Sequence, residues 1–429
     1  MKRLSTAQPN FEAAFTALLT RGTQEARIAV AVRDIVVSVR RGGDSAVVAY
    51  TNKFDRVHIT PAKLRITAEE IAAATAEISP ELHDALALAA KRIEAFHRAQ
   101  LPKDIEFTDE TGATLGMRWG ALDAVGIYVP GGKASYPSSV LMNALPAKVA
   151  GVQRIAMCVP APDGILNPLV LAAAQLAGVS EIYRIGGAQA VAAMAYGTPT
   201  IKKVDRIVGP GNAYVAEAKR QVFGAVGIDS IAGPSEVLIL ADASSNPEHL
   251  AYDLLAQAEH DEDAQAILCT DSAGLAEAVD REVTKALATL PRSKIAAESI
   301  YRNGAIILVR DWAEAVALAN RVAPEHLQIL VAEPEKLFAE IRHAGAVFLG
   351  PRCPEAIGDY VAGPNHVLPT SGTARFASGL SVYDFLKRTT WVSLDEAALA
   401  AIGPAAVTLA EAEGLTAHAQ SVALRLPKT

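Results

Sequence analysis

Short apolar runs alternate with segments of helical periodicity along most of the chain, and this alternation leaves few possible fold classes. The runs of a first series are residues 125–129, 154–159, 181–185 and 205–208. The runs of a second series are residues 237–240, 266–269, 305–309, 327–331 and 346–349. Strands that alternate with helices favour a parallel sheet with right-handed crossovers. The sequence therefore predicts an α/β fold with two similar blocks in tandem.

The first hundred residues lack this alternation and are expected to be mostly helical. Apolar residues recur at helical spacing over residues 62–100, with charges on the opposite face. Three histidines of this part, His58, His83 and His97, have charged neighbours, and we expect all three on the surface.

Composition and charge exclude several classes of protein. The chain has 429 residues, and 51% of them are hydrophobic, which suffices for a sizeable core. Its net charge of -7 argues against nucleic-acid binding, which needs a basic face. We also expect no membrane span, no signal peptide and no disulfide framework, because no long apolar run or paired cysteine motif occurs. These features predict a cytoplasmic protein.

Three glycine turns, at Gly131, Gly187 and Gly211, each lie between an expected strand and an expected helix. Such turns expose backbone N–H groups to an anion, and ligands of open α/β sheets bind at the carboxyl ends of strands. The chain has no complete GxGxxG motif, since Tyr214 stands where the third glycine belongs, and it lacks a P-loop. By themselves, glycines at these turns are more often simple turn formers.

Two pairs of polar residues stand out in the second series. Gln257 and His260 are three residues apart at the end of an expected helix, so both side chains leave one face. An amide oxygen and an imidazole can both bind a divalent metal; the alternative is a solvated helix end with an incidental histidine. Glu325 and His326 precede an apolar strand and suit proton abstraction; the alternative is a capping pair on a turn.

A loop rich in Gly and Pro carries two more polar candidates. Asp359 and His366 lie in this loop, within residues 358–366, and loops of this kind often carry function. The Gly-, Pro-, Ser- and Thr-rich residues 364–381 predict an ordered connection, which a helical tail follows. No HExxH motif occurs, so a zincin-type protease is not indicated.

Taken together, these motifs resemble the histidinol dehydrogenase family over nearly the whole chain. The long runs that carry the resemblance are residues 228–236 and 253–260. Residues 324–327 and 358–366 match further motifs of the family in the right order. Ser245 stands where the family has alanine, away from the implied site.

The resemblance implies a fold of two tandem incomplete Rossmann-like domains with parallel sheets, plus small helical N-terminal and C-terminal segments. The implied segments are residues 1–24 (N-terminal helical), 25–126 with 237–375 (first domain, with metal and acid–base residues), 127–236 (second domain, with NAD contacts) and 376–429 (tail). Family members are homodimers with shared active sites, in which the tail reaches the partner subunit.

The resemblance also implies an activity and a set of site residues. The activity is the zinc- and NAD-dependent four-electron oxidation of L-histidinol to L-histidine through L-histidinal. The implied zinc ligands are Gln257, His260, Asp359 and His418. The implied substrate contacts are these ligands with Ser235, His326, His366 and Glu413. The implied proton-handling residues are Glu325 and His326, and the implied NAD contacts are Tyr128, Gln189 and Asn212.

Three other interpretations stay open at this point. A different zinc alcohol dehydrogenase on the same scaffold would act on another alcohol, such as a sulfonated diol. A catalytically silent metal-binding protein would lack turnover, although both Glu325 and His326 are present. A nucleophilic cysteine, Cys158 or Cys353, would hold the aldehyde covalently, but the sequence indicates no basic partner for either thiol.

Overall fold

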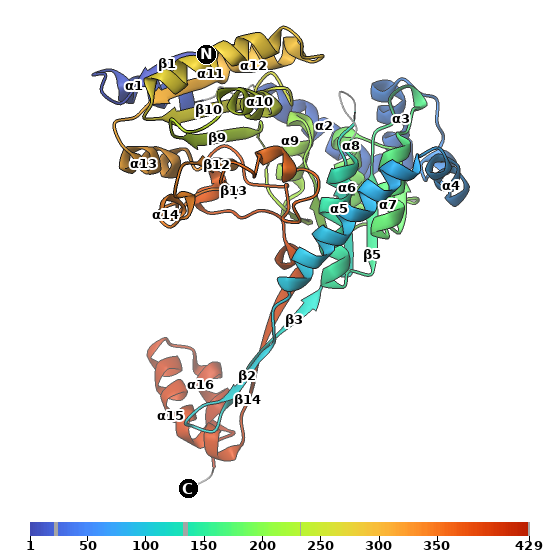
Figure 1. Ribbon diagram of the computed structural model, residues 1–429. Helices are drawn as coiled ribbons and strands as arrows, with labels where there is room; N and C mark the ends of the chain where they lie inside the picture. Colours follow the sequence, from blue (N-terminus) through green and yellow to red (C-terminus); the bar gives the residue numbers. More distant parts are fainter. Residues whose placement is uncertain (21–24, 132–135, 232, 428–429) are drawn as a thin grey trace.

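The computed structural model describes residues 1–20, 25–131, 136–231 and 233–427. The described part leaves out residues 21–24 of the expected N-terminal segment, residue 232 of the run 228–236, and residues 428–429 of the expected tail. Figure 1 shows two α/β lobes and a long ribbon that projects away from both and ends in a pair of helices. Within the described ranges, no helix is long and apolar enough to cross a membrane.

The first lobe is built on a six-stranded parallel sheet. Its strands, in spatial order, are β1 (Lys2–Ser5), β11 (Ala305–Leu308), β10 (Gln265–Thr270), β9 (Glu236–Ala241), β12 (His326–Leu330) and β13 (Ala346–Leu349). One face packs on α10 (Pro247–Ala258), α11 (Ala273–Leu287) and α12 (Ser293–Asn303). The other face packs on α1 (Phe11–Leu19) and α13 (Trp312–Val322). Because both faces are buried, the central strands are mostly apolar.

The second lobe is built on a five-stranded parallel sheet. Its strands, in spatial order, are β6 (Glu181–Tyr183), β5 (Arg154–Cys158), β4 (Ala124–Tyr128), β7 (Arg206–Val208) and β8 (Gly227–Ile228). Helices on one face are α2 (Glu25–Gly42), α3 (Asp44–Asp55), α8 (Gly187–Tyr196) and α9 (Ala213–Val222). Helices on the other face are α5 (Pro80–Ala99), α6 (Pro137–Ala150) and α7 (Pro168–Ala177), and α4 (Ala68–Ala76) packs on α7. The predicted α/β class with parallel sheets is confirmed.

Three features differ from the sequence-based expectations. Residues 25–126 were expected to join residues 237–375, but α2 packs on α8 and α9, and α5 packs on α6, so these helices belong to the five-stranded lobe. Residues 2–5 form an edge strand of the six-stranded sheet rather than a helical start. His97 is fully buried, not exposed, because α5 packs against the loop that carries Asn365; its Nδ1 contacts the Ile93 carbonyl oxygen at 2.8 Å.

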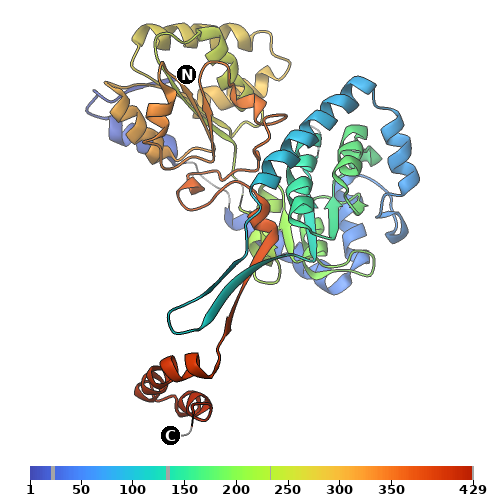
Figure 2. The same ribbon diagram turned by 60° about the horizontal axis from the view of Figure 1, so that its bottom comes forward.

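The projecting ribbon is antiparallel, and the sequence pattern did not predict it. Its strands are β2 (Ile105–Thr108), β3 (Thr114–Ala121) and β14 (Leu386–Ser393). Beyond it lie α15 (Glu396–Ala412) and α16 (Thr416–Ala423), near the C-terminal end, well away from both lobes in two views (Figures 1 and 2). The tail therefore leaves the body of its own subunit.

Candidate active site

The acid–base candidates Glu325 and His326 lie at the amino end of β12 in the six-stranded sheet. His326 is the first residue of β12, and Glu236 is the first residue of the neighbouring strand β9. The loop that carries His366 contacts the other lobe, because Nδ2 of Asn365 donates to the Met142 carbonyl oxygen in α6 at 2.6 Å. The catalytic candidates therefore lie where the two lobes meet.

His326 is held in one orientation by its surroundings. Its Nδ1 lies 3.0 Å from the Glu236 carbonyl oxygen, and because a carbonyl only accepts, Nδ1 carries the proton and Nε2 keeps its lone pair. Burial is the main cause that lowers the pKa of His326 to about 4; the carboxylate of Asp359 opposes the shift. His326 is therefore neutral near pH 7 and can accept a proton at Nε2.

Glu325 is buried beside this histidine and anchors the same strand start. Its Oε2 accepts a hydrogen bond from the Glu236 backbone N–H at 2.9 Å and lies 3.8 Å from Nδ1 of His326. Glu325 and His326 therefore both contact the backbone of Glu236 on the neighbouring strand: Glu325 accepts from its N–H, and His326 contacts its carbonyl oxygen.

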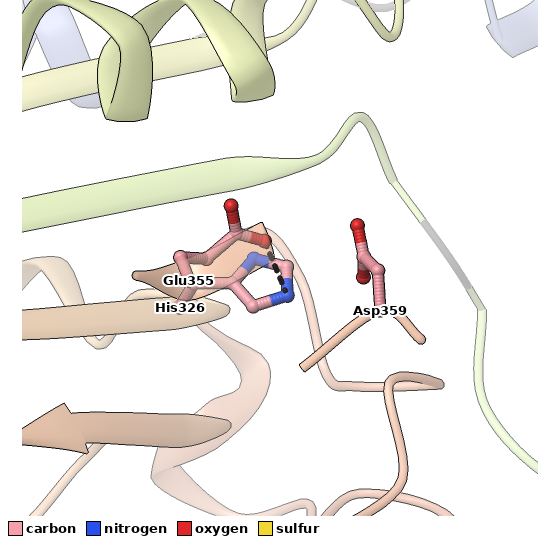
Figure 3. Close-up of side chains that lie close together, drawn as sticks. All are labelled: His326, Glu355 and Asp359. Carbon is pink, nitrogen blue, oxygen red and sulfur yellow. Dashed lines mark ion pairs between the residues drawn. The ribbon is translucent and has the colours of Figure 1, made fainter. Parts of the chain in front are cut away.

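A second buried carboxyl group, Glu355, faces the other side of the imidazole, and sequence reasoning missed it. It lies in the short helix η3 (Glu355–Ile357), and its Oε1 is 3.5 Å from Nε2 of His326 (Figure 3). Burial, followed by the negative charges of Asp359 and Asp253, raises the pKa of Glu355 to about 8. In the sequence it is one more glutamate in a loop, with no pattern that marks it.

Asp359 connects the loop to two histidines. Nδ1 of His366 lies 3.3 Å from Oδ1 of Asp359, and Nε2 of His260 lies 3.9 Å from Oδ2. Burial raises the pKa of Asp359, but the hydrogen bond and charge of His366, with the charges of His326 and His260, outweigh burial and hold it below its usual value. The fold therefore brings His260 and Asp359, which are 99 positions apart in the sequence, next to each other.

The donor set around Asp359 fits a divalent metal. Gln257, one turn before His260, is buried, and its Oε1 has no hydrogen-bond donor among the described residues. A buried oxygen left without a donor is costly unless another group binds it, and a cation can do so. A second combination also offers ligand atoms within 4.8 Å of one another, namely His326, Glu355 and Asp359. We favour the first set because it explains the unsatisfied amide.

The three NAD candidates lie at the carboxyl ends of strands in the five-stranded sheet. The hydroxyl of Tyr128 accepts a hydrogen bond from the Gly187 N–H at 3.0 Å, and burial raises its pKa to about 12. Gln189 is buried in α8, where no described residue donates to its Oε1. Asn212 is exposed and caps α9, with Oδ1 accepting from Tyr214 at 3.0 Å. Their placement suits a ligand at this edge of the sheet.

A buried ion pair fixes the turn before Asn212. Lys219 and Asp229 form the pair, and their side chains expose only 2% and 4% of their surface. Lys219 donates to the Gly209 carbonyl oxygen at 3.0 Å, and Asp229 accepts from the Gly209 N–H at 2.8 Å. Gly209 itself has a φ of +112°, and a β-carbon there would clash with the carbonyl oxygen of Tyr128.

We predict that Lys219→Met lowers the free energy of unfolding by about 3–5 kcal/mol, because it leaves Asp229 buried without its cation. It should also raise the KM for NAD, since the turn that carries Asn212 loses an anchor. Denaturant unfolding and steady-state kinetics measure both effects. The double variant Lys219→Met/Asp229→Leu should regain stability, but its KM for NAD should stay raised. A Lys219→Met variant as stable as wild type would contradict the prediction.

Three other candidates differ in their placement. Ser235 is half-buried directly before β9, at the same edge as Glu236. Glu413 and His418 lie on the exposed tail, at the end of α15 and in α16. Because the ribbon carries them away from both lobes (Figure 2), they do not join the Asp359 cluster of their own chain.

The family profile described as histidinol dehydrogenase matches residues 19–426. The chain belongs to the histidinol dehydrogenase family. The histidinol dehydrogenase of Gluconobacter oxydans is 64% identical over the full length of both chains. That of Rhodospirillum rubrum is 60% identical over 99% of this chain and 98% of its own. The crystal structure of the histidinol dehydrogenase from Elizabethkingia anophelis, at 38% identity, covers 99% of this chain and 98% of its own with a TM-score of 0.94.

The three cysteines of the chain are all free thiols. Cys158 and Cys269 are buried within strands, and burial raises the pKa of both. A buried thiol of this kind behaves as a small hydrophobic group rather than a nucleophile. Cys353 is half-buried and lies two residues before Glu355.

We predict that Cys353→Ser keeps kcat for histidinol oxidation within about twofold of wild type, because a nucleophilic thiolate needs a basic partner and none pairs with Cys353 among the described residues. Steady-state kinetics and alkylation of the wild-type thiol test this. A loss of activity on the scale of general-base removal, with folding intact, would instead point to a covalent thiohemiacetal.

Proposed function

We propose that the protein catalyses the NAD-dependent oxidation of L-histidinol to L-histidine through L-histidinal, the last step of histidine biosynthesis. Family membership over residues 19–426 carries the proposal. The meeting of His260, His366 and Asp359 next to a neutral, buried His326 supports it, because an alcohol oxidation needs a positioned base. We also propose the cytoplasm as its location, which the three free cysteines favour.

One zinc ion per site is part of the proposal. Its ligands are Gln257, His260, Asp359 and His418 of the partner subunit, a set of two nitrogen and two oxygen donors. When bound, zinc orients the amine and imidazole of the substrate and stabilises negative charge on the alcohol oxygen. The unsatisfied Oε1 of Gln257 is the observation that favours this set.

The proton steps fall to the residues at the start of β12. Nε2 of His326 accepts the proton of the alcohol as hydride leaves to NAD. For the second oxidation, Glu325 and His326 activate a water molecule that adds to the aldehyde, and a second NAD takes the second hydride. Ser235, His366 and Glu413 of the partner subunit hold the substrate in this scheme.

The NAD site and the dimer complete the proposal. Tyr128, Gln189 and Asn212 contact NAD at the carboxyl edge of the five-stranded sheet. The tail reaches the active site of a partner subunit in a homodimer. Apolar side chains left exposed on the ribbon and tail support such a partner, among them Phe107, Val392 and Leu409.

An NADH assay with histidinol tests the function. We expect roughly two NADH per histidinol consumed, with histidine as the product. Chelation should abolish turnover, and added zinc should restore it, because the metal orients the substrate. A higher kcat/KM on another alcohol, such as a sulfonated diol, would favour a different zinc alcohol dehydrogenase. No NADH from any alcohol in the presence of zinc would indicate a silent binding protein.

A further inference from the structure

The two ring nitrogens of His326 have different partners. Nδ1 contacts the Glu236 carbonyl oxygen at 3.0 Å, which cannot take up a proton. The ring is 5% exposed and lies against Phe348, with ring centroids 6.2 Å apart. A proton gained at Nε2 therefore leaves most directly from Nε2. In a reaction with two oxidation steps, Nε2 has to lose its proton before it can act as a base again.

Glu355 is placed at that nitrogen. Its Oε1 lies 3.5 Å from Nε2 of His326, and Figure 3 shows the carboxyl group next to the ring, with Asp359 across from both. Glu355 is 3% exposed, so bulk water competes little for the contact. The segment that carries it is tightly packed: a β-carbon at Gly358 would lie 2.7 Å from the ring of Phe348. The segment that carries Glu355 thus packs on the same aromatic ring that contacts His326.

A buried carboxyl group is costly unless it is satisfied, and Glu355 stands beside a group that changes its charge during the reaction. Glu325, in contrast, lies on the Nδ1 side and accepts from the Glu236 N–H. The two carboxyl groups therefore serve opposite sides of the imidazole.

We propose that Glu355 is the proton partner of His326: after each alcohol or hydrate deprotonation, the proton passes from Nε2 of His326 to Oε1 of Glu355. In this step the N–H bond of the imidazolium breaks, an O–H bond forms on the ionised form of Glu355, and no electrons are transferred. Glu355 then gives this proton to water, so that its carboxylate is available again for the second deprotonation. The neutral imidazole is thereby regenerated for the second oxidation. The inference rests on the proposed function, and it makes Glu355 a residue that acts through His326 rather than on the substrate.

The test is Glu355→Gln, which keeps the shape and polarity of the side chain but cannot take up a proton. We expect kcat for histidinol to fall at least ~10-fold and the solvent deuterium isotope effect on kcat to rise, because proton removal becomes limiting. KM for histidinol and zinc content should stay within about twofold of wild type. Asp44→Asn in the other lobe is the matched control, since it removes another buried carboxyl, which accepts from the Thr200 hydroxyl at 2.6 Å, and it should leave kcat unchanged.

Each outcome decides the proposal. An unchanged kcat in Glu355→Gln, with wild type active on histidinol, overturns the relay but leaves the proposed function in place. Loss of zinc from Glu355→Gln also overturns it, in favour of a metal site formed by His326, Glu355 and Asp359. If Glu355→Gln does not fold, Glu355→Asp and Glu355→Asn replace it. The relay requires the aspartate variant to be the faster of the two, and equal rates reject it.

Discussion

Replacing His326 by glutamine should lower kcat for histidinol oxidation by about 10²–10⁴-fold, which is the usual contribution of a general base to the rate. The amide can still donate to the Glu236 carbonyl oxygen, which His326 contacts at 3.0 Å, so the start of β12 keeps its geometry. It cannot accept a proton at working pH. Because His326 is not among the proposed zinc ligands, metal content should stay near wild type. Steady-state kinetics and metal analysis measure the two quantities.

A matched control separates the base from a general effect of losing a histidine. His83→Gln makes the same substitution at an exposed position of α5 and should leave kcat unchanged. Equal falls in kcat and kcat/KM for His326→Gln would locate the loss in the transition state. Wild-type turnover in this variant would remove His326 from the mechanism.

The parallel sheets were predictable because their strands are buried on both faces. Residues 237–240 and 266–269 are continuous apolar runs, and each lies inside an observed strand, β9 and β10. A buried parallel strand has to be apolar along its whole length, so the sequence signal is strong. The turn that carries Asn212 was found for a similar reason, since only glycine fits at Gly209 with its positive φ.

The ribbon was missed because it has no buried face of its own. Ile105 and Phe107 of β2 are about half exposed, and β14 is polar over most of its length. The sequence also did not predict which of the two sheets the early helices cover, because an apolar helix face does not specify the surface on which it packs. Their assignment to the five-stranded lobe follows from the contacts of α2 and α5 with α8 and α6.

Within the candidate site, local motifs identified residues but not their surroundings. Glu325 and His326 stood out as adjacent titratable groups before a strand. Glu355 did not, since a single glutamate in a loop is usually a surface residue. It becomes informative only when the fold places its Oε1 3.5 Å from Nε2 of His326. The burial of His97 is likewise set by tertiary packing between α5 and the loop that carries Asn365.

The direction of the ribbon leads to the last prediction. Asp359 lies in the lobe interface, whereas His418 lies on the tail beyond β14, so one chain cannot bring both to one metal in this conformation (Figure 1). If the tail serves a partner, Asp359→Asn and His418→Gln homodimers should each be almost inactive, because every site lacks a ligand. A heterodimer of the two variants should regain about half of the wild-type kcat, since one site receives both mutations and the other receives none.

Co-expression with two different affinity tags, followed by two purification steps, isolates this heterodimer. Its activity and zinc content should rise together, to about one intact site per dimer. The double variant Asp359→Asn/His418→Gln paired with wild type is the control: there each site carries one mutation, so the heterodimer should stay almost inactive. The reverse pattern, with activity in the control and none in the mixed dimer, would mean that each site is built from one chain, because the mutations then fall together in the control and separately in the mixture.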